Sequence, residues 1–240
     1  MNKYISTFIF VLLASISGLS AQDWNLVLLS SEKFRAFSDD GFSFDYALKE
    51  QEQESTASMR VFVKPQDPLT VAVKYLTPER YENRRVLVGA GGFWLMDRGM
   101  NSPLRISPQQ MLFGQAAAGD ITRVSFSLQY DIRTGEEKEG EVVLELQKKS
   151  QSDVSFPRVR LILEPGVYKP RKAEFYSDSG QLSKSILYEK YGTVEGREMV
   201  LGFRIINELN HQETWVQLGG YKKIRLGNQY FTRTGFGKIP

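Results

Sequence analysis

Side chains that commonly carry out chemistry are scarce in this chain. Its 240 residues include a single histidine, His211, and no cysteine. Zinc sites built from cysteine and histidine are therefore excluded, and a serine or cysteine nucleophile activated by histidine has little support. His211 lies in the polar stretch 207–212, which predicts a solvated loop rather than a catalytic position. We expect no metal, no cofactor and no enzymatic activity.

Two weaker chemical patterns lead to the same expectation. The glycine-rich run 89–92 is followed by Trp94-Leu95-Met96 and not by helix-forming residues, so it predicts a hairpin turn rather than a phosphate-binding loop. The chain has 28 acidic residues, and any two of them could meet in space as a hydrolytic carboxylate pair. No pair stands out, so a carboxylate-dependent hydrolase is kept only as a less favoured alternative.

The first 21 residues predict export. Lys3 precedes the apolar run 4–16, and residues 17–21 supply small side chains before a cleavage point. The apolar run is too short to span a bilayer comfortably. We expect residues 1–21 to be a signal peptide cleaved after Ala21, which places the mature protein in the periplasm. The absence of cysteine agrees with a core that holds together without disulfides, and it removes the lipidation site of a lipoprotein.

Charge and length indicate an ordinary globular protein after this segment. The formal net charge is +3, and the lysines and arginines are spread along the chain, so a nucleic-acid partner is not expected. No linker, low-complexity tract or internal repeat divides residues 22–240. We expect these residues to form one domain with its own hydrophobic core, and the protein to be a monomer.

The elements that must position any site are mostly strands. After residue 40, apolar and polar residues alternate with the period of two that is typical of half-buried strands. Phe42 and Phe44 follow this rhythm, as do Met59 and Val61, although Phe62 breaks it. The pattern predicts a mainly β protein of about ten short strands with few helices. A sheet of this size coils, and short helices can fill its concave face.

Two segments are the candidates for helices. Residues 23–37 place Trp24, Val27, Leu28 and Phe34 near one face, as an amphipathic helix would. Residues 107–130 begin with Ser-Pro, a good helix start, and are interrupted at Gly114 and at Gly119-Asp120. This second segment therefore predicts two short helical pieces rather than one long helix.

Two long motifs resemble a known family. Residues 81–120 read YENRRVLVGAGGFWLMDRGMNSPLRISPQQMLFGQAAAGD, and residues 168–177 read YKPRKAEFYS, followed by Gly180. The Trp-Leu strand, the Arg-Ile-Ser-Pro segment and the closing Gly-Asp resemble the LolA-like family of outer-membrane lipoprotein-sorting proteins. The resemblance extends over roughly residues 40–238 of the chain. Residues 97–99 depart from it, because Asp-Arg-Gly stands where the family has a proline turn.

The resemblance implies a half-barrel, in which a curved antiparallel sheet wraps around short helices. It also implies a periplasmic protein that binds lipid or the acyl chains of lipoproteins and carries them in outer-membrane lipoprotein sorting. Its partners would then be an inner-membrane exporter of the ABC type and an outer-membrane acceptor. A regulatory or sensor module on the same fold is the main alternative, since one fold serves several functions.

Acyl chains would need an apolar cavity. Each buried methylene contributes about 0.8 kcal/mol, so a chain of about 16 carbons would contribute on the order of 10 kcal/mol before ordering costs. Methionine and aromatic side chains suit a loosely complementary pocket. The residues expected to line it are Phe42, Phe44, Met59, Val61, Val73, Trp94, Met96, Met111, Leu112, Phe113, Val124 and Phe126. We further expect residues 107–130 to form a lid latched by an Arg105–Asp120 ion pair.

Overall fold

A computed structural model describes residues 22–51, 55–89, 91–122 and 125–240. The predicted signal peptide and Val124 lie outside these ranges. The described residues form fifteen strands, with two α-helices and three short 3-10 helices. None of the described helices is both long and apolar enough to cross a membrane.

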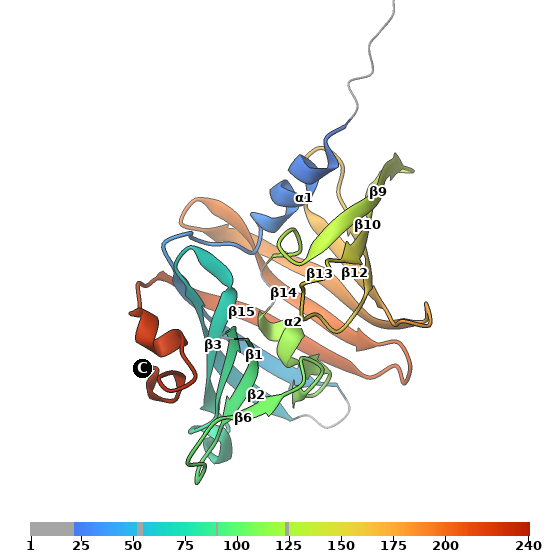
Figure 1. Ribbon diagram of the computed structural model, residues 1–240. Coiled ribbons are helices and arrows are strands. Elements are labelled where there is room, and N and C mark those ends of the chain that lie inside the picture. Colours follow the sequence, from blue (N-terminus) through green and yellow to red (C-terminus); the bar gives the residue numbers. More distant parts are fainter. Residues whose placement is uncertain (1–21, 52–54, 90, 123–124) are drawn as a thin grey trace, which may run out of the picture.

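Thirteen strands form one antiparallel sheet that is built from two arms (Figure 1). The first arm comprises β1 (Phe42–Glu50), β2 (Thr56–Lys64), β3 (Asp67–Thr77), β4 (Arg85–Gly89), β5 (Gly92–Met96) and β6 (Leu104–Ile106). The second arm comprises β9 (Tyr130–Lys138), β10 (Glu141–Lys148), β11 (Arg158–Leu163), β12 (Pro170–Tyr176), β13 (Leu182–Val194), β14 (Arg197–Asn207) and β15 (Glu213–Lys223). A 3-10 helix, η1 (Glu79–Tyr81), follows β3.

Consecutive strands are neighbours within each arm, and the arms join where β1 pairs with β15. The sheet stays open, with β6 at one edge and β9 at the other. Between β6 and β9 in the chain, the described residues 107–122 and 125–129 lie between the two arms (Figure 1). The predicted mainly β half-barrel is confirmed, with more strands than the alternation alone indicated.

Each face of the first arm buries its own set of apolar residues. The inner face contributes Phe42, Phe44, Met59, Val61 and Val73 to the main core cluster. Across the outer face, side chains at opposed positions of neighbouring strands form a second cluster with the C-terminal segment, which contains η2 (Asn228–Phe231) and η3 (Phe236–Lys238). The second cluster contains Phe62, Ala72, Leu87, Trp94, Phe231, Phe236 and Ile239. Phe62 breaks the alternation because the outer face is buried there as well.

Helix α1 (Trp24–Glu32) closes one end of the half-barrel. Asp23 caps it by accepting bonds from the amides of Asn25 and Leu26, at 3.0 and 3.4 Å. The buried residues Val27 and Leu28 confirm the predicted inner face. The helix ends at Glu32, whereas the sequence pattern predicts a helix that continues to residue 37. Phe34 is buried and lies in the irregular structure that follows the helix.

The packing of α1 on β9 depends on Gly135. A Cβ atom at this position would lie 2.3 Å from the ring of Trp24, which is too close for any real contact. We expect Gly135→Val to lower the free energy of unfolding by about 1–3 kcal/mol, as overpacking does. Urea denaturation measures the change. Gly219→Val is the matched control, because nothing lies within 4 Å of a Cβ at that strand position; an equal loss there would contradict this explanation.

The first half of the segment 107–130 is not helical, in contrast to the prediction. Met111–Phe113 (β7) pairs with Ala116–Ala117 (β8), and a helix appears only at Ala118–Thr122 (α2). Gly114 turns the chain between the two strands with a φ of 49°, a value that opposes a right-handed helix at this point. A Cβ there would also lie 2.4 Å from the Thr214 hydroxyl, so the hairpin tip approaches β15 closely.

Candidate functional site

The candidate site surrounds the segment formed by β7, β8 and α2, residues 111–122, which we call the plug. Three of its apolar residues face the core: Ala116 and Ala118 are fully buried, and Leu112 is nearly so. All three belong to the main core cluster, together with the inner-face residues of β1 and β2. The plug therefore occupies the apolar interior that the open sheet encloses.

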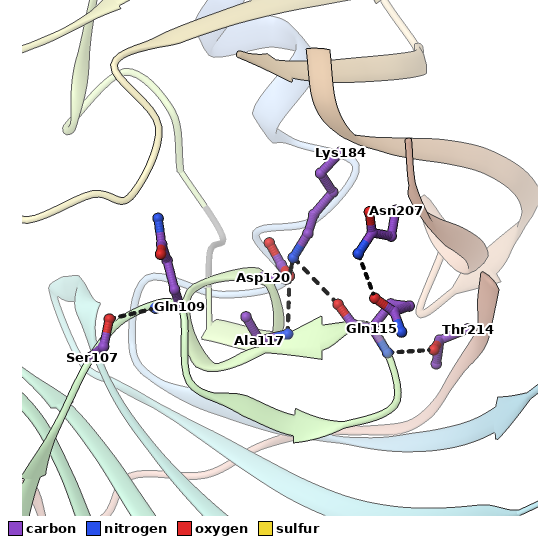
Figure 2. Close-up of polar contacts among 8 residues, drawn as sticks. All are labelled: Ser107, Gln109, Gln115, Ala117, Asp120, Lys184, Asn207 and Thr214. Carbon is purple, nitrogen blue, oxygen red and sulfur yellow. Dashed lines mark hydrogen bonds and ion pairs between the residues drawn. The ribbon is translucent and has the colours of Figure 1, made fainter. Parts of the chain in front are cut away.

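A buried ion pair fastens the plug to the second arm (Figure 2). The Asp120 carboxylate lies 2.5 Å from the Lys184 ammonium of β13, and the two side chains are only 2% and 6% exposed. The same carboxylate accepts a 3.0 Å bond from the Ala117 amide, and Lys184 donates to the carbonyl of Gln115 at 3.3 Å. Removing either charge would leave the other buried without compensation.

Gln115 adds a polar anchor at the tip of the hairpin. Its backbone amide donates to the Thr214 hydroxyl at 2.8 Å, and its side-chain oxygen accepts from Asn207 at 2.9 Å (Figure 2). Its side-chain nitrogen donates to Gln212, also at 2.9 Å. These partners belong to β14, to β15 and to the turn between them. The plug is thus bound to the sheet mainly through polar groups, whereas its contacts with the interior are apolar.

Tyr75 and Glu32 fix the plug and the chain that follows it. The Tyr75 hydroxyl of β3 donates to the Leu112 carbonyl at 2.8 Å, and burial raises the pKa of Tyr75, which keeps the donor proton in place. The Glu32 carboxylate, at the end of α1, accepts from the amides of Phe126 and Ser127 at 2.5 and 2.6 Å. It also accepts from the hydroxyls of Ser125 and Ser127, both at 2.9 Å.

Two cavities open beside these attachments. The first, which we call the helix-side cavity, has a volume of about 430 Å³. Its apolar border consists of Leu29, Ala36, Phe42, Val63, Pro68 and Leu128. Its polar border consists of Glu32, Ser38, Asp39, Lys64, Gln66, Ser125 and Ser127. Leu29 and Leu128 are each 48% exposed at its border. Its size falls in the lower half of the range of roughly 300–1,000 Å³ that is usual for ligand pockets.

The second, which we call the turn-side cavity, has a volume of about 310 Å³ and lies at the Asp120–Lys184 pair. Its walls are more polar, with hydroxyl side chains from Ser155, Ser177 and Ser183. Met111 and Leu209 provide apolar surface, and Leu209 is 57% exposed. The two cavities therefore differ in character, and the apolar one suits an acyl chain better.

The structure places most of the predicted cavity residues on the inner side. Phe44, Met59, Val61 and Val73 are buried core residues, as are Leu112 and Phe126, and Phe113 packs against the same cluster. Phe42 borders the helix-side cavity and Met111 the turn-side cavity. The inner residues thus form one continuous apolar interior, whereas Val124 lies outside the described residues.

Three predicted positions require correction. Trp94 and Met96 lie on the outer face of β5 with the C-terminal segment, because the strand alternation that directs Phe93 inward directs them outward. Arg105 does not latch the plug: its guanidinium donates to the Gly91 carbonyl at 3.3 Å and lies over the Trp94 ring. Asp120 pairs instead with Lys184, which lies outside the set of predicted site residues.

The described residues offer little that resembles catalytic chemistry. No group of three or more histidine, cysteine, aspartate or glutamate side chains among them could hold a metal ion. His211 is exposed in the turn between β14 and β15, as predicted. Gly89 pairs with Gly92, which confirms the predicted hairpin rather than a phosphate-binding loop.

Several solved structures have this fold. A LolA superfamily protein from Nitrosomonas europaea has a TM-score of 0.77 at 24% identity, covering 87% of this chain and 97% of that protein. A putative outer membrane lipoprotein-sorting protein domain from Vibrio parahaemolyticus has a TM-score of 0.70 at 17% identity, covering 89% and 98%. A DUF1329 family protein from Desulfovibrio piger has a TM-score of 0.70 at 15% identity, covering 88% and 96%.

The comparison with family models gives a match over most of the chain. A model described as an uncharacterized protein family matches residues 70–237, which include β4 to β15 and the whole plug. No curated protein matches the sequence. The chain therefore belongs to this family of uncharacterized proteins, and it has the LolA-like fold.

Proposed function

We propose that the protein binds acyl chains of lipids or lipoproteins in the periplasm and acts as a carrier in outer-membrane lipoprotein sorting. The observation that carries this proposal is the largely apolar helix-side cavity, which opens where Glu32 binds residues 125–127, just after the plug in the chain. An acyl chain would enter at Leu29 and Leu128 and extend inward as the plug moves aside. The LolA-like fold supports the proposal, because an open half-barrel can enclose such a chain.

Binding is favoured over catalysis because the two carboxylates that hold the interior segments already have hydrogen-bond or ion-pair partners. Asp120 accepts hydrogen bonds from Lys184 and from the Ala117 amide. Glu32 accepts four hydrogen bonds from residues 125–127. Neither carboxylate is free to act as a general base. A carrier also needs donors and acceptors of cargo, for which we propose an inner-membrane exporter of the ABC type and an outer-membrane acceptor.

Charging the border of the helix-side cavity tests the site. We expect Leu128→Glu to weaken the binding of a fluorescent fatty-acid analogue about tenfold, because it removes apolar contact and places a charge against the acyl chain. Stability should change little, since the side chain is already 48% exposed. Fluorescence titration of the folded variant gives the dissociation constant, and urea denaturation checks the fold.

Leu209→Glu is the matched control, because it makes the same change at an exposed leucine of the turn-side cavity. The analogue should bind this variant as it binds the natural protein. If Leu209→Glu weakens binding and Leu128→Glu does not, the ligand occupies the turn-side cavity and the helix-side assignment is wrong. If the natural protein binds no fatty-acid analogue at all, the proposed function is wrong.

A further inference from the structure

Arg35 is a buried cation in the interior of the half-barrel. Its side chain follows α1, and the residue is 8% exposed. A guanidinium remains charged at any pH that a protein normally meets, so it cannot avoid the cost of burial by losing its proton. Arginine is almost never buried without a paired acidic group.

No such acidic group is present among the described residues. Arg35 makes no ion pair within 4.0 Å there; its Nη2 donates to the hydroxyl of Tyr46 at 3.2 Å. Its guanidinium also lies over the ring of Phe203, 5.5 Å from the centroid. The phenol groups of Tyr188 and Tyr221 also lie near the guanidinium. These neighbours offer polar hydroxyl groups but no negative charge.

A row of buried aromatic rings connects the border of the helix-side cavity to this cation. Phe42, which borders the cavity, stacks on Phe44 with ring centroids 5.8 Å apart. Phe44 in turn contacts Tyr46, with centroids 5.1 Å apart. The three rings lie on the inner face of β1 at alternate positions, so they form one row that ends at the Arg35 guanidinium. Ala36, which borders the cavity, follows Arg35 in the chain.

We propose that Arg35 binds the carboxylate of a free fatty acid whose chain displaces part of the interior packing along this aromatic row. The proposal rests on the acyl-chain binding proposed above, and it adds a free fatty acid, entering with its charged end first, to the ligands that the interior can take. A carboxylate offers the guanidinium two acceptors and supplies the missing negative charge. A neutral acyl ester or alcohol would leave the cation uncompensated.

The first measurement needs no variant. Calorimetric titration of the full chain with dodecanoic acid and with dodecanol compares ligands that differ in the charged end. We expect the acid to bind about tenfold more tightly or better, because a hydrogen bond to a charged group is lost in the alcohol. Equal binding of the two would overturn the proposal for Arg35 and leave the acyl-binding function intact. Binding of neither would overturn both.

Arg35→Met then assigns the preference to the residue. This variant keeps an unbranched side chain and removes the buried charge, so we expect it to stay folded. Dodecanol should bind it at least as well as the natural protein, and the preference for the acid should disappear. Arg197→Met is the matched control, since Arg197 donates to the carbonyls of Phe37 and Ala36 and carries the same charge. A preference that survives in Arg35→Met, or is lost equally in Arg197→Met, would show that Arg35 has a structural role only.

Discussion

Asp120→Ala is expected to lower the free energy of unfolding by about 3–5 kcal/mol, because it leaves the Lys184 ammonium buried without a counter-charge. The Lys184 side chain is 6% exposed, so most of it would stay buried after the carboxylate is lost. The substitution also removes the acceptor of the Ala117 amide inside the plug. Urea denaturation followed by circular dichroism gives the change directly.

Two comparisons separate this effect from a general loss of charge. Glu198→Ala removes the partner of Lys169 in a pair where the glutamate is 45% exposed, and it should cost no more than about 1 kcal/mol. Replacing both members of the buried pair, as Asp120→Leu with Lys184→Met, should restore most of the stability, because no lone charge remains. A loss below about 1 kcal/mol in Asp120→Ala would mean that the pair is hydrated and does not hold the plug.

A disulfide between the plug and β15 is expected to abolish the uptake of acyl chains. Gln115→Cys with Thr214→Cys places thiols at two neighbouring positions, because the backbone amide of Gln115 donates to the Thr214 hydroxyl at 2.8 Å. The chain has no other cysteine, so no competing disulfide can form. If the plug must move for the ligand to enter, the oxidised variant should take up no fatty-acid analogue, and reduction should restore uptake.

The single variants Gln115→Cys and Thr214→Cys, treated with the same oxidant, show whether the substitutions themselves disturb binding. Uptake should be the same for the oxidised and reduced forms of each. Equal uptake by the oxidised and reduced double variant would show that the plug is a fixed part of the core. The ligand would then be confined to the helix-side cavity.

Much of the fold could be predicted from alternation alone. Phe42, Phe44, Met59 and Val61 are apolar at every second position, and the structure buries all four on the inner face. Alternation separates the two faces of a strand but does not say which one is inner. The sequence pattern therefore predicts Trp94 and Met96 in the cavity, although the C-terminal segment covers them on the outer side. Phe62, which breaks the alternation, was the indication that this outer face is buried too.

The plug and the Asp120–Lys184 ion pair that holds it were harder to predict. A short hairpin such as β7–β8 depends on its contacts with β15 and not on any local periodicity, so the Ser-Pro start suggested a helix instead. Lys184 could have been identified: it lies two and four residues before Ile186 and Tyr188, which are buried on the inner face of β13. A lysine on an apolar face predicts a buried acidic partner, but only the fold shows that Asp120 is that partner.

The pairing of β1 with β15 affects the order in which the molecule can assemble. Within each arm, strands that follow one another along the chain are neighbours, so their contacts are local and can form early. The junction instead joins residues 42–50 to residues 214–223, and it closes a loop of most of the chain. When the chain is synthesised or exported from its N-terminus, the sheet therefore becomes continuous only after β15 has appeared. Until then, β1 and β14 each have one edge whose backbone N–H and C=O groups are unpaired and can bind other chains. A chaperone would be most useful during this interval.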